Sequence, residues 1–161
     1  MLLQGLVHAA AALLLVAGAQ KVRDPLPLVR AARSVGLRLD RQLVRALAGA
    51  EMLVGVAALL DGARWTALLV AASYAVFTGF VVTARLRGGV LASCGCFGKA
   101  DVPPTRTHAV LTGAVALGAL TGAPGALPLT AAAVVTTAAV AVTAYLALAV
   151  LPLVQAQARV Q

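Results

Sequence analysis

The sequence predicts an all-α membrane protein, a polytopic helix bundle, and three observations support this fold class. Hydrophobic residues make up 61% of the 161-residue chain, and charged residues make up only 11%. Soluble domains carry about 25% charged residues, so a soluble core of this size would leave much apolar surface in water. The apolar residues also run in long stretches between short polar connectors, which is typical of helices that use lipid as their solvent.

We expect one integral membrane domain over residues 1–161, with a four-helix core and a fifth, C-terminal span. The predicted spans cover residues of about 3–19, 43–60, 65–84, 106–120 and 127–151. A bilayer core of about 30 Å needs roughly 20 apolar residues, so the first stretch is only just long enough. The lipid bilayer is therefore the first partner that the sequence implies.

The connector after the first span is strongly basic and holds a short amphipathic segment. Pro25 and Pro27 break any continuous helix that leaves the first span. Over residues 28–35, apolar side chains fall on one side of a helix, and Arg30 and Arg33 fall elsewhere. We expect this short helix to lie in the membrane interface, where its arginines reach lipid phosphates.

Polar residues within the spans are candidates for contacts between helices. Glu51 lies in the second span, and a carboxylate in hydrocarbon is costly enough that it normally faces the bundle interior. A functional role and a protonated, hydrogen-bonded structural role both fit this residue. Nearby, Gly49 and Gly55 are expected to allow close helix approach. Four residues of the third span are expected to form hydrogen bonds between helices: Ser73, Tyr74, Thr78 and Thr83.

The net charge of +8 is interpreted as a topology signal rather than as a nucleic-acid surface, because only 4% of residues are aromatic and could stack on bases. With five spans, one side of the membrane receives seven, four and one Lys/Arg residues, and the other side receives Arg64 alone. The positive-inside rule then predicts a cell-membrane protein with its N-terminus outside and residues 88–107 in the cytoplasm. Stable structural disulfides are rare in the reducing cytoplasm, so a pair of cysteines on that side is expected to be a reversible dithiol.

Both cysteines of the chain lie in this connector, as Cys94-Gly95-Cys96. A disulfide between them closes a small ring, and strained, exposed disulfides tend to be labile or catalytic. Positive charge from neighbours such as Arg85 would favour the reactive thiolate. Three interpretations remain open: dithiol redox chemistry, a small buried pair, and a soft-metal site completed by His108. No metal ligand set is assigned, because a fourth ligand is not evident.

The motif Cys94–Gly98, followed by His108 at the start of the next span, resembles the MauE family of methylamine-utilisation membrane proteins, which are grouped with DoxX-like proteins. Ala17–Val22 looks like the family's glycine-x-x-lysine exit from span one. Glu51 followed by Gly55 looks like its span-two glutamate and glycine. The likeness covers roughly residues 5–120.

The resemblance implies a redox-associated role in maturing a disulfide-rich partner, beside a thioredoxin-like protein. The layout is also similar to that of the DsbB and vitamin K epoxide reductase proteins, which pass electrons to a quinone but use more cysteines than the two present here. We therefore expect Cys94 and Cys96 as the redox pair, Glu51 and His108 as proton-transfer or tuning groups, and a quinone as the one cofactor suggested. The alternatives are a non-catalytic membrane anchor or assembly subunit and a metal-handling protein.

Overall fold

The computed structural model describes residues 2–61, 63–87 and 106–121, and every regular element in these residues is a helix. The predicted all-α fold class is therefore confirmed. The helices are α1 (Leu2–Arg23), α2 (Leu26–Ser34), α3 (Arg41–Asp61), α4 (Arg64–Leu86) and α5 (Arg106–Thr121). They match the four predicted core spans and the short connector helix in order. The fifth span expected at 127–151 lies outside the described residues.

Three of these helices are long and apolar enough to cross a membrane: Gly5–Arg23, Arg41–Asp61 and Arg64–Leu86. Their outward sides carry large hydrophobic residues. Leu53 on α3 is 73% exposed and Val76 on α4 is 69% exposed. Such residues are unfavourable in water and suited to lipid chains. α5 is a shorter apolar helix.

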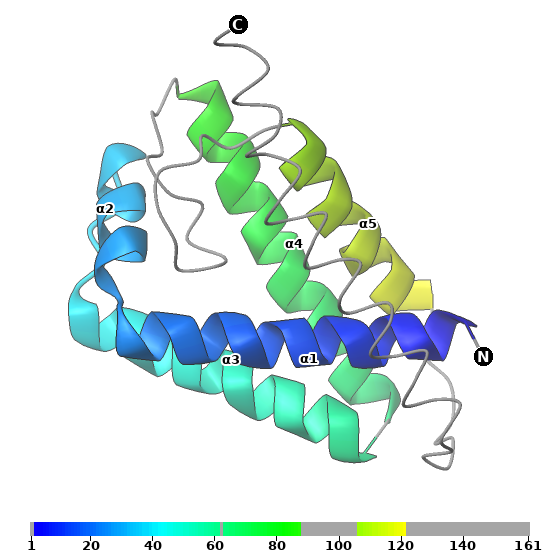
Figure 1. The fold of residues 1–161 in the computed structure, drawn as a ribbon. Coiled ribbons are helices and arrows are strands. Elements are labelled where there is room, and N and C mark those ends of the chain that lie inside the picture. The colour runs from blue at the N-terminus through cyan, green and yellow to red at the C-terminus, as the bar shows by residue number, and fades with distance from the viewer. Residues whose placement is uncertain (1, 62, 88–105, 122–161) are drawn as a thin grey trace, which may run out of the picture.

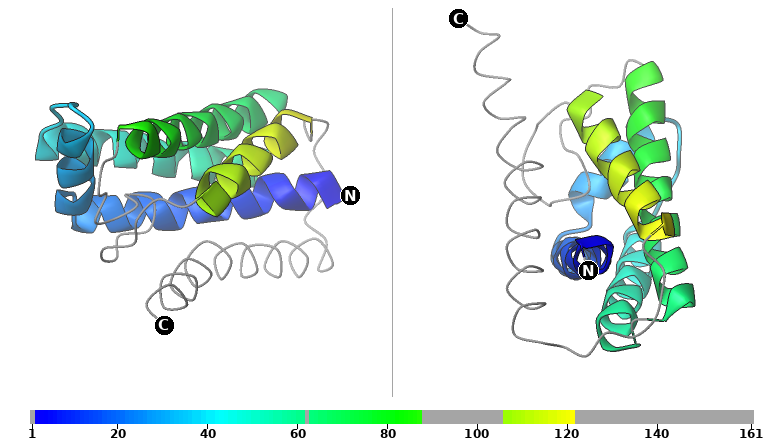
Figure 2. Two further views of the ribbon diagram at one scale, coloured as in Figure 1. Left: turned by 90° about the horizontal axis from the view of Figure 1, so that it is seen from above. Right: turned by 90° about the vertical axis from the view of Figure 1, so that its right-hand side faces the viewer.

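The helices form two antiparallel pairs. α1 lies along α3, and α4 lies along α5 (Figures 1 and 2). In the view of Figure 1 the second pair crosses α1 steeply, and α2 stands beside the C-terminal end of α1. An apolar cluster holds the pairs together, with Leu14 from α1, Ala58 from α3, Val70 from α4 and Ala116 from α5. This cluster is the core of the described part of the chain.

Two glycines allow the backbones of α1 and α3 to approach closely. A Cβ atom at Gly55 would lie 2.8 Å from the carbonyl oxygen of Ala11, and one at Gly18 would lie 2.8 Å from the carbonyl oxygen of Ala48. Real Cβ atoms do not sit so close, so both positions require glycine at this helix spacing. The prediction of close approach is confirmed for Gly55. It is wrong for Gly49, where a Cβ would meet nothing within 4 Å.

α2 packs against the end of α4. Ala31 and Val35 are buried together with Ala84, and Phe80 packs against this cluster. The guanidinium of Arg87, just after α4, donates a hydrogen bond to the carbonyl of Val35. The apolar side of the amphipathic helix is thus covered by protein, a contact that its sequence pattern alone did not assign. α2 connects the α1–α3 pair to the C-terminal end of α4.

Aspartate side chains accept backbone N–H groups at the start of α2 and α3, and a glycine follows the end of α2. A carboxylate oxygen of Asp24 accepts the backbone N–H of Leu26 at 3.1 Å, and Asp40 accepts that of Leu43 at 2.7 Å. Both aspartates therefore serve backbone donors that a helix N-terminus leaves free. After α2, Gly36 adopts φ +84°, the left-handed conformation that favours glycine and ends the helix.

Hydrogen bonds between helices involve two of the four residues predicted to make them. The hydroxyl of Thr78 on α4 donates to that of Thr112 on α5 at 2.9 Å, and the hydroxyl of Tyr74 donates to α1. The remaining two residues donate instead to carbonyls of α4 itself: Ser73 and Thr83. For these two the prediction is wrong, because a hydroxyl on a helix can satisfy itself one turn back.

Replacing Gly55 with valine should destabilise the bundle, because the new side chain would overlap the backbone of α1. Overpacking of this kind costs about 1–3 kcal/mol. We expect a lower midpoint of thermal unfolding for the detergent-purified Gly55→Val variant, measured by loss of the monodisperse gel-filtration peak after heating. Gly49→Val is the matched control on the same helix and should behave like the unaltered chain. Equal midpoints for both variants would contradict the close α1–α3 contact.

Candidate functional site

A buried ion pair joins α1 to α3. The Nζ atom of Lys21 donates a hydrogen bond to Oε2 of Glu51 at 2.7 Å, and the two side chains are 4% and 15% exposed. Lys21 lies in the last turn of α1, where the free carbonyls at a helix C-terminus favour a cation. Glu51 lies near the middle of α3 and faces α1, in agreement with the expectation that a carboxylate in a span faces the interior.

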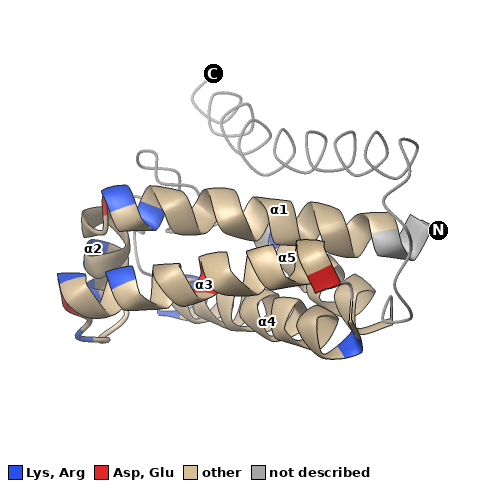
Figure 3. Cartoon of the chain, turned by 90° about the horizontal axis from the view of Figure 1, so that it is seen from below, with Lys and Arg blue, Asp and Glu red and all other residues tan. Residues whose placement is uncertain are grey.

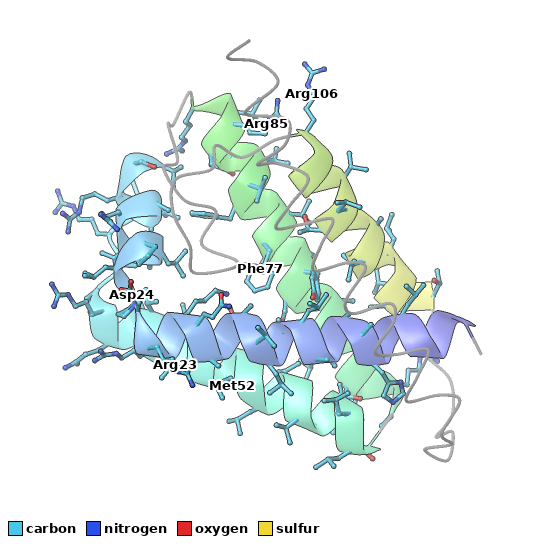
Figure 4. The ribbon with its side chains drawn as sticks, in the orientation of Figure 1. Arg23, Asp24, Met52, Phe77, Arg85 and Arg106 are labelled. Carbon is cyan, nitrogen blue, oxygen red and sulfur yellow. The ribbon has the colours of Figure 1, made fainter. Side chains whose placement is uncertain are left out.

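An aromatic ring from a third helix completes this cluster. Nζ of Lys21 lies 4.2 Å from the ring centroid of Phe77, which points from α4 toward α1 (Figure 4). The rings of Phe77 and Tyr74 meet edge to face with centroids 5.8 Å apart. The hydroxyl of Tyr74 donates to the carbonyl of Ala10 on α1 at 3.1 Å. Lys21, at the end of α1, consequently contacts side chains of both α3 and α4.

The contacts of Lys21 with Glu51 and Phe77 limit the chemistry that this cluster can perform. A cation held against both a carboxylate and the face of an aromatic ring is compensated on two sides, and a desolvated cation–π contact contributes about 2 kcal/mol. The pair as a whole carries no net charge, which suits a low-dielectric setting. Oε1 of Gln20, next to Lys21, is buried and accepts no hydrogen bond from the described residues. For Glu51 to act as a free base, Lys21 would have to withdraw from it.

The remaining candidate residues flank or occupy the connector between α4 and α5. Cys94 and Cys96 lie outside the described residues. His108 is in the first turn of α5, and its side chain also lies outside the described part. The structure therefore joins Glu51 to Lys21 but leaves its relation to the cysteines and the histidine as a prediction.

The end of α4 and the start of α5, which flank the cysteines, lie on the same side of the molecule. Arg85, in the last turn of α4, and Arg106, at the start of α5, lie at the same end of this antiparallel pair (Figure 4). Arg87 anchors that end to α2 through the carbonyl of Val35. The connector that carries the cysteines thus leaves and re-enters the bundle at an end rich in arginine.

The part of the chain that the structure describes contains no cluster of metal ligands. No group of three or more His, Cys, Asp or Glu side chains there is arranged to hold an ion. The soft-metal hypothesis depends on Cys94 and Cys96, so it stays a prediction.

Comparison with known families places this arrangement in context. The sequence model of the family described as "Methylamine utilisation protein MauE" matches residues 1–125, well over half of the chain. The chain belongs to the MauE family. The matched region includes every described helix, the Lys21–Glu51 pair and both cysteines. The grouping of the chain with DoxX-like proteins stays an expectation. No curated protein and no solved structure matches the chain.

Lys21 is the member of the cluster that sequence reasoning did not assign to Glu51. It lies at the start of a run of basic residues, and the topology count treats it only as one of these residues. Its resemblance to the lysine of the MauE-family exit from span one was a second signal. Combining the two would have singled out one cation at a span end and one carboxylate inside the next span, which in lipid require each other.

The ion pair can be tested by breaking it and then replacing both partners. Glu51→Gln leaves the Lys21 ammonium buried without its counter-charge, and loss of one partner of a buried pair costs about 3–5 kcal/mol. We expect a clearly lower thermal midpoint for this variant in detergent. The double variant Lys21→Met/Glu51→Met removes both charges and should recover most of the loss.

The control is Asp61→Asn, which removes an exposed carboxylate at the C-terminal end of α3. This variant should leave the midpoint of thermal unfolding unchanged. A double variant as unstable as Glu51→Gln would contradict pairwise compensation. If the double variant is stable but fails to support methylamine utilisation, the pair has a role in function beyond holding the helices together.

Proposed function

We propose that this MauE-family chain is a membrane thiol–disulfide protein of methylamine utilisation, with Cys94 and Cys96 as its redox pair. The observation that supports the proposal is the antiparallel packing of α4 on α5, which fixes both ends of the cysteine-bearing connector at one arginine-rich end. An extended residue spans at most about 3.6 Å, so the chain can carry Cys94 no further than about 25 Å from Arg87. The chain therefore tethers the dithiol to the arginine-rich end within this reach.

The proposed reaction is a two-electron exchange with a disulfide in a partner protein. A thiolate of the pair attacks one partner sulfur, a mixed disulfide forms, and the other partner sulfur leaves as a thiolate that takes up a proton. The second cysteine then loses its proton and attacks the mixed disulfide. The Cys94–Cys96 pair becomes a disulfide, and the partner leaves with two thiols. The reverse direction passes through the same mixed disulfide.

The partner class follows from this exchange: a thioredoxin-like protein or a disulfide-rich protein that is being matured. A quinone is the alternative acceptor, since it takes up the two electrons and two protons that a dithiol gives as it closes to a disulfide. Glu51 and His108 are proposed as groups that transfer these protons or tune the pair. His108 follows Arg106 by two positions in the first turn of α5.

Replacing either cysteine with serine should abolish reversible exchange while leaving membrane insertion intact. The chain has only two cysteines, so thiol labelling of purified protein reports on this pair alone. In glutathione buffers of graded potential, a maleimide–polyethylene glycol reagent should add two labels to the reduced chain and none to the oxidised one. The variant that keeps the attacking thiol and lacks the resolving one should accumulate a mixed disulfide with its partner in cells, and the cysteine that remains in that variant is the attacking thiol.

Normal methylamine-dependent growth of the double serine variant would overturn the redox proposal and favour a membrane anchor or assembly subunit. Stoichiometric Zn or Cu(I) bound to the purified chain, and lost in the same variants, would instead favour metal handling.

We propose further that the cysteine connector faces the cytoplasm, because the basic connectors lie on its side of the membrane. A membrane-impermeant maleimide should leave Cys94 and Cys96 unlabelled in intact cells and label them after permeabilisation with reductant. In a background without native cysteines, Ala63→Cys at the opposite end of α4 should be labelled in intact cells. Labelling of the native pair in intact cells would reverse the proposed orientation.

A further inference from the structure

Exposed arginines gather at the end of the molecule where α1 and α2 meet the start of α3. Lys and Arg concentrate there in Figure 3, and few acidic residues accompany them. The exposed arginines between α1 and the first turns of α3 are Arg23, Arg30, Arg33, Arg38, Arg41 and Arg45. We call these six residues the arginine surface.

The acidic residues nearby are few, and none forms an ion pair with the six arginines among the described residues. Asp24 and Asp40 each accept a backbone N–H at the start of a helix, as described above. The carboxylate of Glu51 is bound to Lys21. Among the described residues, Lys21–Glu51 is the ion pair at salt-bridge distance, and it includes none of the six arginines. The six arginines therefore outnumber the two aspartates beside them, Asp24 and Asp40, and the region keeps an excess of positive charge.

The packing of α2 determines which way its arginines face. Ala31, Ala32 and Val35 are buried, with Ala31 and Val35 against α4, so Arg30 and Arg33 lie on the other side of α2 and are exposed. Residues three apart are neighbours on a helix surface. Each guanidinium presents a fork of N–H donors that matches two oxygens of a phosphate group.

Large apolar side chains surround the same end. Leu26, Leu37 and Leu43 are each 40–49% exposed. Arginines beside exposed leucines, at the ends of two helices that can span a membrane, fit a ligand with an anionic phosphate and a hydrocarbon tail. A soluble phosphate or an acidic peptide would use the arginines but leave the leucines in water.

We propose that the arginine surface binds the phosphate headgroup of anionic phospholipids, with Arg30 and Arg33 as the principal contacts and the exposed leucines against the acyl chains. Because α2 also packs on α4 and Arg87 bonds to the end of α2, lipid bound to α2 stabilises the junction between the two helix pairs. This proposal does not depend on the redox chemistry of the cysteines.

The experiment measures the stability of the full chain in neutral detergent as lipid is added. Phosphatidylglycerol should raise the midpoint of thermal unfolding, whereas phosphatidylcholine with the same acyl chains and inorganic phosphate should not. In Arg30→Gln/Arg33→Gln, the phosphatidylglycerol concentration that gives half of this rise should increase at least about tenfold, as expected when hydrogen bonds to a charged group are lost. Native mass spectrometry should show fewer retained phosphatidylglycerol molecules on the same variant.

The matched control is Arg64→Gln, which removes an exposed arginine at the opposite end of α4 and should respond to phosphatidylglycerol like the unaltered chain. Arg30→Lys/Arg33→Lys keeps the charge and the fold but loses the bidentate donors. Its response should therefore lie between that of the unaltered chain and that of Arg30→Gln/Arg33→Gln. Equal stabilisation by phosphatidylcholine, equal stabilisation by inorganic phosphate, or an unchanged response of the glutamine double variant would each overturn the proposal.

Discussion

The arrangement of the helices depends above all on one contact, the ion pair between Lys21 and Glu51. Lys21 is 4% exposed and its ammonium has one carboxylate, that of Glu51, at 2.7 Å. In a medium of low dielectric constant an unpaired charge is costly, so the pair favours the alignment of α1 and α3 that brings these two residues together. Phe77 then faces the same ammonium from α4, which extends the alignment to a third helix.

The packing of small residues makes this alignment attainable. Gly18 and Gly55 bring the α1 and α3 backbones within reach, and Arg45 adds a hydrogen bond to the carbonyl of Val22 at the end of α1. The α4–α5 pair instead carries the Thr78–Thr112 hydrogen bond. The two pairs are thus held by different means, and Lys21 belongs to the contact between them.

The sequence predicts the helices well because their signals are local. Long apolar stretches identify α1, α3, α4 and α5, and Pro25 with Pro27 separates α1 from α2. Contacts between helices are harder to predict, since the long connector between α1 and α3 imposes no register. Glu51 could be assigned to the interior from its cost in lipid, but Lys21 could not be distinguished from other basic residues by composition. Gly49 and Gly55 look equivalent in sequence, and only the direction that each faces separates them.

The separation of Lys21 and Glu51 along the chain also has a consequence for biogenesis. The two residues are 30 positions apart, so the lysine leaves the ribosome well before the glutamate. Before Glu51 has been synthesised, the long side chain of Lys21, near the end of α1, can reach the headgroup layer at little cost in free energy. Glu51, near the middle of α3, has no such outlet. A second span that inserts after the first can therefore bring its carboxylate to a cation that is already at the membrane.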